Sequence, residues 1–125
     1  MDAAQSNIEV VDAAFAALLE GDLDGALTRF EEDARYGVAQ WLPNAGMHEG
    51  RTGIRAYLSS IRERFGGDYK MLHLNVYATA DHVFAEMTRA SDGDPYAEGS
   101  EHVLLVAHLV MGKIREVREF AYAVR

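Results

Sequence analysis

The sequence contains no cysteine, which excludes disulfide bonds, structural zinc sites built from thiolates, and catalysis by a thiol nucleophile. Basic residues are scarce, because 12 lysines and arginines stand against 20 aspartates and glutamates, for a formal net charge of -8. A chain with this charge repels phosphate backbones and anionic lipid headgroups at long range. We therefore expect no nucleic acid and no membrane surface among its partners.

Long apolar runs and targeting signals are also missing. No apolar run approaches the ~20 residues that a membrane-spanning helix needs. The first ten residues carry Asp2 and Glu9 and have no basic segment before an apolar run, unlike a signal peptide. Because the lack of cysteine is compatible with a reducing compartment, we expect a cytoplasmic protein.

Motifs of nucleophile, cofactor and metal chemistry are absent as well. The serines lack a Gly-x-Ser-x-Gly context, and the chain has neither a glycine-rich phosphate loop nor a dinucleotide fingerprint. His102 and His108 share a face of one predicted strand, but six residues of strand separate them by about 20 Å, too far to ligate one ion. We expect neither a cofactor nor a metal ion.

The composition that remains is that of a globular protein with a packed core. Of the 125 residues, 49% are hydrophobic. This length fits a single domain, residues 1–125, and the chain shows no repeat and no low-complexity segment.

Apolar residues recur at helical spacing in the first part of the chain. Ser6 and Glu9 have the spacing of a capping box and predict the start of a first helix, which Gly21 ends. Asp22 predicts the N-cap of a second helix that runs to about Phe30.

A third helix shows the clearest periodicity. Thr52 is its predicted N-cap, and Gly66 stops it. The apolar positions at i, i+3, i+4, i+7 and i+11 are Ile54, Tyr57, Leu58, Ile61 and Phe65.

The remaining segments predict strands. One short strand covers residues 35–42 and is followed by a loop. Later strands are expected at 70–79, 82–90, 98–110 and 114–124, joined by turns at Ala80-Asp81, at 91–95 and at 111–113. Helices first and a meander after them predict an α+β fold with helices packed on one face of an antiparallel sheet.

The order of these elements and several local motifs resemble the nuclear-transport-factor-2-like superfamily, and more closely its SnoaL-like branch. The segments that carry the resemblance are FAALLEGDLDGAL at 15–27, FEEDA at 30–34, EGRTGIRAYL at 49–58, GKI at 112–114 and REF at 118–120. The resemblance covers nearly the whole chain. It implies a cone-shaped half-barrel, with three N-terminal helices on a curved antiparallel sheet around a mostly apolar pocket. It also implies a homodimer formed through the outer face of the sheet.

Members of this superfamily include polyketide cyclases, a ketosteroid isomerase, epoxide hydrolases and dehydratases, but their catalytic residues are mostly missing here. The approximate matches to the acid-base groups of the isomerase are Ala14, Val38 and the region of Leu104, and none of them can donate or accept a proton. Where the hydrolases place arginine and aspartate two apart on a central strand, this chain has Met87-Thr88-Arg89. The cyclases end their last strand in Arg-Glu-Tyr-Phe-Asp, and Tyr122 stands at the place of that aspartate.

Glu86 is the leading candidate for acid-base chemistry. It shares a strand face with Phe84 and Thr88, and a carboxylate desolvated on a pocket wall suits proton transfer. The alternative is a Glu on the outer face or in an ion pair. His102 is a second candidate at a pocket mouth, with a solvated or hydrogen-bonded histidine as the alternative.

Aromatic residues on the predicted strands suit the binding of an apolar small molecule. Tyr36, Trp41 and Phe120 are the candidates for the pocket wall, and the alternative is that they are simple core residues. Arg118 is a candidate for holding an anion or enolate, or else it forms an ordinary ion pair with Glu116 or Glu119.

Two hypotheses of function remain open. In the first, the protein binds an apolar small molecule and acts as a cofactor-independent isomerase, cyclase or dehydratase. Glu86 or His102 then moves the proton, and Tyr122 donates a hydrogen bond to the developing oxyanion. In the second, the protein is a non-catalytic ligand-binding or dimerisation module, which the loss of the family's acids and bases favours.

Overall fold

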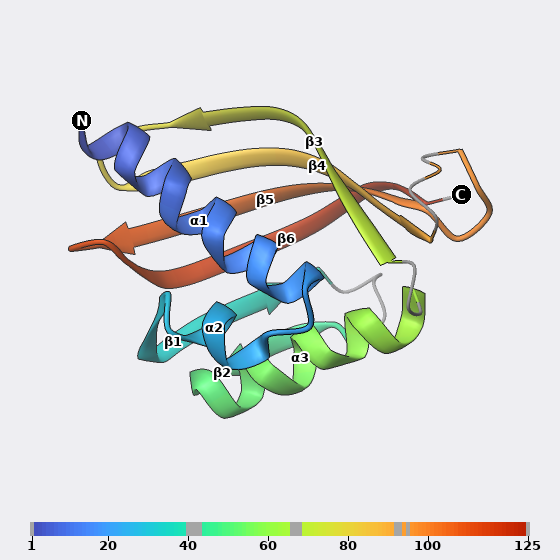
Figure 1. Cartoon of the computed structure of the whole chain (residues 1–125), viewed down its shortest axis with the longest axis horizontal. Helices are drawn as coiled ribbons and strands as arrows, with labels where there is room; N and C mark the ends of the chain where they lie inside the picture. The colour runs from blue at the N-terminus through green and yellow to red at the C-terminus, as the bar shows by residue number, and fades with distance from the viewer. Residues whose placement is uncertain (1, 40–43, 66–68, 92–93, 95, 125) are drawn as a thin grey trace.

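A computed structural model describes residues 2–39, 44–65, 69–91, 94 and 96–124, with the side chains of 69–74, 91 and 122–124 outside this description. Three helices lie against one face of a curved sheet of six strands, in the order β2-β1-β6-β5-β4-β3 (Figure 1). In chain order the elements are α1 (Ala3–Leu19), α2 (Leu23–Leu27), β1 (Phe30–Val38), β2 (Gly46–Glu49), α3 (Gly50–Phe65), β3 (Tyr69–Ala78), β4 (His82–Ser91), β5 (Glu101–Val110) and β6 (Lys113–Val124).

The α+β architecture agrees with the prediction, but the sheet is mixed rather than antiparallel throughout. Strands β1 and β6 run parallel, with Tyr36 opposite Val117 and Val38 opposite Glu119. The other neighbouring pairs are antiparallel. A parallel pair needs a long crossover connection, so this pairing joins segments far apart in sequence that no local pattern relates.

The first helix begins one turn earlier than predicted. Asp2, not Ser6, is its N-cap, and the Asp2 carboxylate accepts a hydrogen bond from the backbone N–H of Gln5 at 2.8 Å. The corner after the helix is confirmed. Gly21 has a φ of 81°, and Asp22 caps α2 by accepting from the backbone N–H of Gly25 at 2.8 Å.

Three boundaries between residues 27 and 52 differ from the prediction. Helix α2 ends at Leu27, and Phe30 is the first residue of β1 rather than the end of a helix. A strand, β2, pairs with β1 just after the segment predicted as a loop, and α3 begins at Gly50 instead of after Thr52. Phe30 is buried, and one buried aromatic residue fits a helix end and a strand start equally well.

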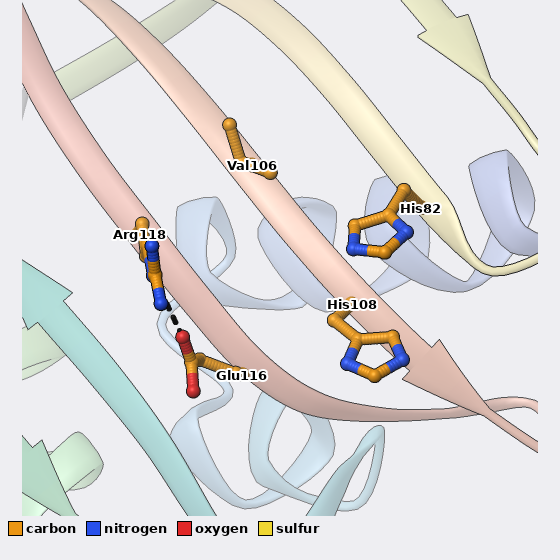
Figure 2. Close-up of a pocket in the computed structure, with 5 residues that line it drawn as sticks. All are labelled: His82, Val106, His108, Glu116 and Arg118. Atoms are coloured by element: carbon orange, nitrogen blue, oxygen red, sulfur yellow. Dashed lines mark hydrogen bonds and ion pairs between the residues drawn. The ribbon is translucent and has the colours of Figure 1, made fainter.

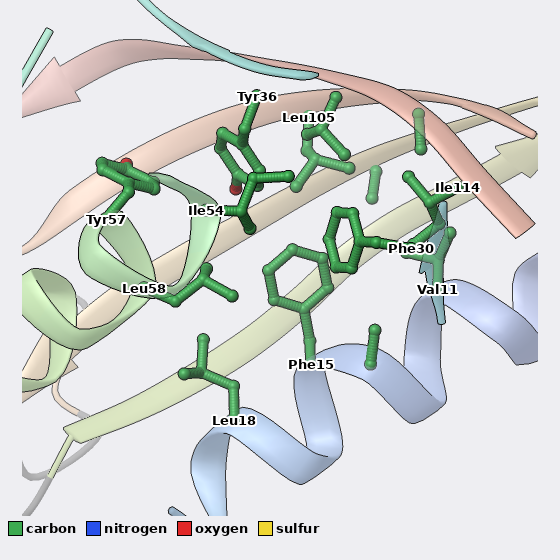
Figure 3. Close-up of a cluster of buried hydrophobic side chains, with 14 of the residues drawn as sticks. Val11, Phe15, Leu18, Phe30, Tyr36, Ile54, Tyr57, Leu58, Leu105 and Ile114 are labelled. Atoms are coloured by element: carbon green, nitrogen blue, oxygen red, sulfur yellow. The ribbon is translucent and has the colours of Figure 1, made fainter. Parts of the chain in front are cut away.

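The core lies between the helices and the face of the sheet that they cover, which we call the inner face. Side chains from α1 and α3 point toward this face (Figure 3). All five predicted apolar positions of α3 are buried, as the periodicity indicates. Burying a large apolar side chain of this kind contributes about 1.5–3 kcal/mol.

Alternation along the strands decides which side chains reach this core. On β5 the odd-numbered residues, such as Val103 and Leu105, are buried against the helices. The even-numbered residues, such as Leu104 and Val106, are half-buried on the opposite face, which we call the outer face. The same alternation on β4 and β6 assigns each candidate functional residue to one face.

Candidate functional site

Four charged residues meet on the inner face, in what we call the inner-face ionic cluster: Arg64, Arg89, Glu101 and Glu119. Arg89 on β4 lies directly opposite Glu101 on β5, and its Nη2 donates to Glu101 Oε2 at 2.6 Å. Its Nη1 donates to Glu119 Oε1 on β6. Arg89 and Glu119 are each only 1% exposed, so one guanidinium joins two carboxylates inside the core.

Two tyrosine hydroxyls complete the surroundings of Glu119. Tyr57 of α3 donates to Glu119 Oε2, and Tyr36 of β1 donates to Oε1 at 3.5 Å. The two phenol rings lie 5.0 Å apart, centroid to centroid, and both tyrosines are buried. The parallel pairing of β1 with β6 brings Tyr36 beside Glu119, because Val38 and Glu119 are register partners.

The ionisation state of Tyr57 follows from this environment. Burial, and then the negative charge of Glu119, raise the pKa of the Tyr57 phenol far above its ordinary value. Tyr57 therefore keeps its proton at neutral pH and acts as a hydrogen-bond donor, not as a base.

Arg64 and His48 lie at the periphery of the cluster. Arg64 Nη1 is 2.9 Å from Glu101 Oε1, and its side chain is partly exposed. The His48 ring stacks on Tyr57 with 4.8 Å between centroids, and its Nε2 lies 2.7 Å from the carbonyl oxygen of Asn44. These contacts hold Glu101 and Tyr57 in place from the solvent side.

The cluster balances two cations against two anions, so its net charge is zero when all four groups are ionised. Desolvating charged groups is costly, and the loss of one partner leaves a buried charge uncompensated. Chemically, the arrangement offers a carboxylate that can accept a proton, with a guanidinium and two hydroxyls that can stabilise negative charge beside it.

The residues that the sequence singled out divide between the two faces. Tyr36 lies on the inner face. Glu86 and His102 lie on the outer face, where His102 Nδ1 is 3.2 Å from Thr88 Oγ1. A catalytic role for Glu86 or His102 therefore requires a substrate on the outer face, and that role stays a prediction.

The other candidates also lie away from the inner face or outside the description. Arg118 and Phe120 lie on the outer face, and Arg118 forms the ion pair with Glu116 that was one of its two predicted roles. Trp41 and the side chain of Tyr122 are outside the described residues. The site residues predicted from the sequence do not include Arg89, Glu101, Glu119 or Tyr57.

Within the described ranges, no group of three or more histidine, aspartate or glutamate side chains is arranged to hold a metal ion. The same part of the chain contains no helix that is both long and apolar enough to cross a bilayer.

Sequence comparison gives one family match. Residues 11–117 match the profile of the SnoaL-like domain. No curated protein matches the sequence.

Solved structures with the same fold cover almost the whole chain. Bal32a, from a soil-derived mobile gene cassette, is 25% identical with a TM-score of 0.78, and the match covers 97% of this chain and 92% of that one. A proposed ketosteroid isomerase from Kribbella flavida is 15% identical with a TM-score of 0.78, covering 100% and 84%. TerC, co-crystallised with polyporic acid, is 19% identical with a TM-score of 0.76, covering 93% and 91%. Identities this low are evidence of a shared fold, not of a shared reaction.

Proposed function

The chain belongs to the SnoaL-like domain family, and on that premise we propose that it binds an apolar small molecule on the inner face and transfers a proton with Glu119. The observation that carries this proposal is the buried Glu119 carboxylate, which is surrounded by the donors of Arg89, Tyr57 and Tyr36. Buried titratable groups that converge in an apolar setting are typical of functional sites, and in this group burial raises the pKa of the Tyr57 phenol.

The substrate class follows from the groups present. A carbonyl compound with an acidic neighbouring C–H gives its proton to a Glu119 oxygen, and the electron pair of the broken C–H bond moves to the carbonyl oxygen as an enolate. The hydroxyl of Tyr57 or Tyr36 donates to that oxygen, and the Arg89 guanidinium stabilises its charge. Returning the proton from Glu119 to another carbon gives isomerisation. Donating it instead to a β-hydroxyl oxygen, as the C–O bond breaks and the enolate electrons form the C=C bond, releases water and gives dehydration.

The likeness to a proposed ketosteroid isomerase is one of fold, so it serves only to choose a ketone as the first class of substrate to test. The raised pKa of Tyr57 supports its role as donor, because a phenol that stays protonated can donate to an enolate throughout the neutral range. No metal or organic cofactor takes part in the proposed steps.

Proton exchange in D2O tests this proposal with 2-tetralone as the probe. The α-protons of the ketone are followed by NMR as they exchange for deuterium, with the wild-type protein, with Glu119→Gln and with Glu86→Gln. The wild type should accelerate exchange, and Glu119→Gln should lower the rate by about 10²–10⁴-fold, the usual contribution of a positioned base. Glu86→Gln is the matched control on the outer face and should exchange as the wild type does. Equal rates for Glu119→Gln and the wild type would contradict the proposal.

A second candidate function, a non-catalytic dimerisation module, is favoured by the outer face. Phe84 and Phe120 are 37% and 39% exposed. They border Val106 and Leu104, which are their register partners on β5, so the four side chains form one apolar patch. Exposed patches of this kind mark interaction surfaces, and a second copy of the chain is the partner that the family resemblance implies.

Light scattering after size-exclusion chromatography tests the dimer. The wild type should elute with twice the mass of the chain, and Phe120→Lys should elute as a monomer, because the lysine places a charge in the apolar patch. Arg115→Gln is the control on the same strand, since Arg115 pairs with Glu31 outside the patch. A monomeric wild type would remove this candidate.

A further inference from the structure

A hollow of about 310 Å³ opens on the outer face, on the opposite side of the sheet from the inner-face ionic cluster. The residues that line it are His82, Val106, His108, Glu116 and Arg118 (Figure 2). His82, His108 and Glu116 are successive register partners on β4, β5 and β6, and Val106 is paired with Arg118. The short Val106 side chain thus forms an apolar floor between larger polar neighbours.

One wall of the hollow is a pair of stacked imidazoles. The rings of His82 and His108 lie 4.7 Å apart, with 5° between their planes. Hydrogen bonds from His82 and then Thr79 lower the pKa of the Asp81 carboxyl, so Asp81 is ionised and accepts from His82 Nδ1 at 2.9 Å. This bond fixes the orientation of the His82 ring and therefore of the aromatic wall.

The opposite wall presents a positive charge. Arg118 Nε donates to Glu116 Oε1 at 2.7 Å, which anchors the guanidinium beside the hollow. The Arg118 side chain is 65% exposed, whereas that of Glu116 is only 23% exposed. Because a guanidinium has five N–H donors, Arg118 keeps its Nη groups for a ligand while Nε holds Glu116. The exposed charge at this wall is therefore the cation, and an anion is the ligand that it selects.

We propose that this hollow binds a small aromatic carboxylate. The carboxylate accepts hydrogen bonds from the Arg118 Nη groups, in the forked geometry that guanidinium and carboxylate favour. The ring covers Val106 and lies against the imidazoles of His82 and His108, where flat aromatic surfaces pack well. A volume of about 310 Å³ is within the range of small-molecule sites.

This site is independent of the proton-transfer function proposed for the inner face, but it shares Val106 with the apolar patch, so a dimer that covered Val106 would compete with the ligand. None of its five lining residues belongs to the inner-face ionic cluster, and successive residues on β6 point to opposite faces. Loss of Glu119 should therefore leave the hollow intact.

Benzoate is the probe for the test. In an NMR titration, the imidazole Cε1–H signals of His82 and His108 should shift with sodium benzoate and saturate in the wild type. Arg118→Gln should weaken binding by at least about tenfold, the equivalent of one lost charged hydrogen bond. Arg115→Gln, an exposed arginine on the same strand that pairs with Glu31, is the matched control and should bind as the wild type does.

Two further binding measurements test the proposal, one with Glu119→Gln and one with acetate. Glu119→Gln should bind benzoate with unchanged affinity, so a failed proton-transfer proposal and a failed carboxylate site give different results. Acetate should bind at least about tenfold more weakly than benzoate, because it lacks the ring that covers Val106. The proposal is overturned if benzoate causes no saturable shift, if Arg118→Gln binds as tightly as the wild type, or if acetate matches benzoate.

Discussion

The two faces of the sheet use the same kinds of residues in opposite ways, and neighbours on β6 show it most clearly. Arg118 is 65% exposed and pairs with Glu116 in contact with solvent. Glu119, the next residue, is 1% exposed and is held by Arg89 and by a tyrosine hydroxyl of α3. Ion pairs are present on both faces, but of these two only the pair on the inner face is removed from water. On a strand, the parity of a position decides its electrostatic environment.

The difference in environment should appear as a difference in free energy. An exposed ion pair contributes about 0–1 kcal/mol, because water screens it and side-chain entropy opposes it. Removal of one partner from a buried pair costs about 3–5 kcal/mol, because the remaining charge has lost its compensation. Matched substitutions on the two faces therefore test whether breaking an ion pair costs more free energy of unfolding on the inner face than on the outer face.

The largest effect is expected for Arg89→Met. This change leaves the carboxylates of Glu101 and Glu119 buried without their shared cation, and we expect a loss of about 3–5 kcal/mol in the free energy of unfolding. Urea denaturation measures it. Arg118→Met on the outer face is the control and should cost less than about 1 kcal/mol. An equal loss in the free energy of unfolding for the two variants would show that the two faces do not differ in how strongly they desolvate their charges.

Tyr57→Phe should have the next largest effect. It removes the hydroxyl that donates to Glu119 and leaves the carboxylate with fewer donors, so we expect a loss of about 1.5–3 kcal/mol. The same urea experiment applies. Tyr77→Phe, at an exposed tyrosine, should change the stability by less than about 0.5 kcal/mol. A Tyr57→Phe variant as stable as the wild type would show that this hydroxyl does not stabilise Glu119.

Alkaline pH should destabilise the wild type more than Tyr57→Phe. Burial first, and the charge of Glu119 second, raise the pKa of Tyr57 in the folded state above the value of about 10 for an unfolded chain. Below about pH 10 the phenol is protonated in both states. Above it the unfolded state loses the proton first, so the stability falls with a slope of up to about 1.4 kcal/mol per pH unit.

Urea unfolding at about pH 9, 10 and 11 measures this slope. In Tyr57→Phe the contribution of this residue is absent, and the decline should be shallower. Parallel declines in the two proteins would mean that Tyr57 ionises equally well in the folded and unfolded states.

The smallest effect is expected for Glu116→Gln. Its partner Arg118 is well solvated, and we expect a change of less than about 0.5 kcal/mol in the free energy of unfolding. A loss comparable to that of Arg89→Met would show that the outer face also desolvates its charges.

The sequence was sufficient to predict that the three helices and most of the strands exist, because the patterns that indicate them are local. The five buried positions of α3 follow directly from its periodicity. The parallel pairing of β1 with β6 was not predictable in this way, since it depends on contacts between distant segments. The start of α1 was wrong because Asp2 and Ser6 are both good N-caps, and local preference does not choose between them.

The inner face could not be identified from the sequence because both rows of β5 are apolar. Val103 and Leu105 point inward, and Leu104 and Val106 point outward, so alternation alone does not say which row is buried. Glu86 was therefore selected on a face that proved to be the outer one.

The sequence nevertheless contains a pattern that indicates the inner-face ionic cluster. In each of three strands a charged residue stands in line with apolar residues at every second position, and these charged residues are Arg89, Glu101 and Glu119. On β4, for example, Val83, Ala85 and Met87 precede Arg89 at this spacing, and all four are buried. A charge placed in a buried row requires a partner. The register that brings the three together is tertiary, and it becomes visible only in the folded sheet.

A methyl NMR titration with 2-tetralone tests whether an apolar ligand binds on the inner face, because methyl groups report separately on the two faces. If the ligand binds beside Glu119, the methyl signals of Ile54, Leu58 and Met87 should shift, and those of Leu104 and Val106 should not. Shifts confined to Leu104 and Val106 would place the apolar ligand on the outer face and exclude binding beside Glu119.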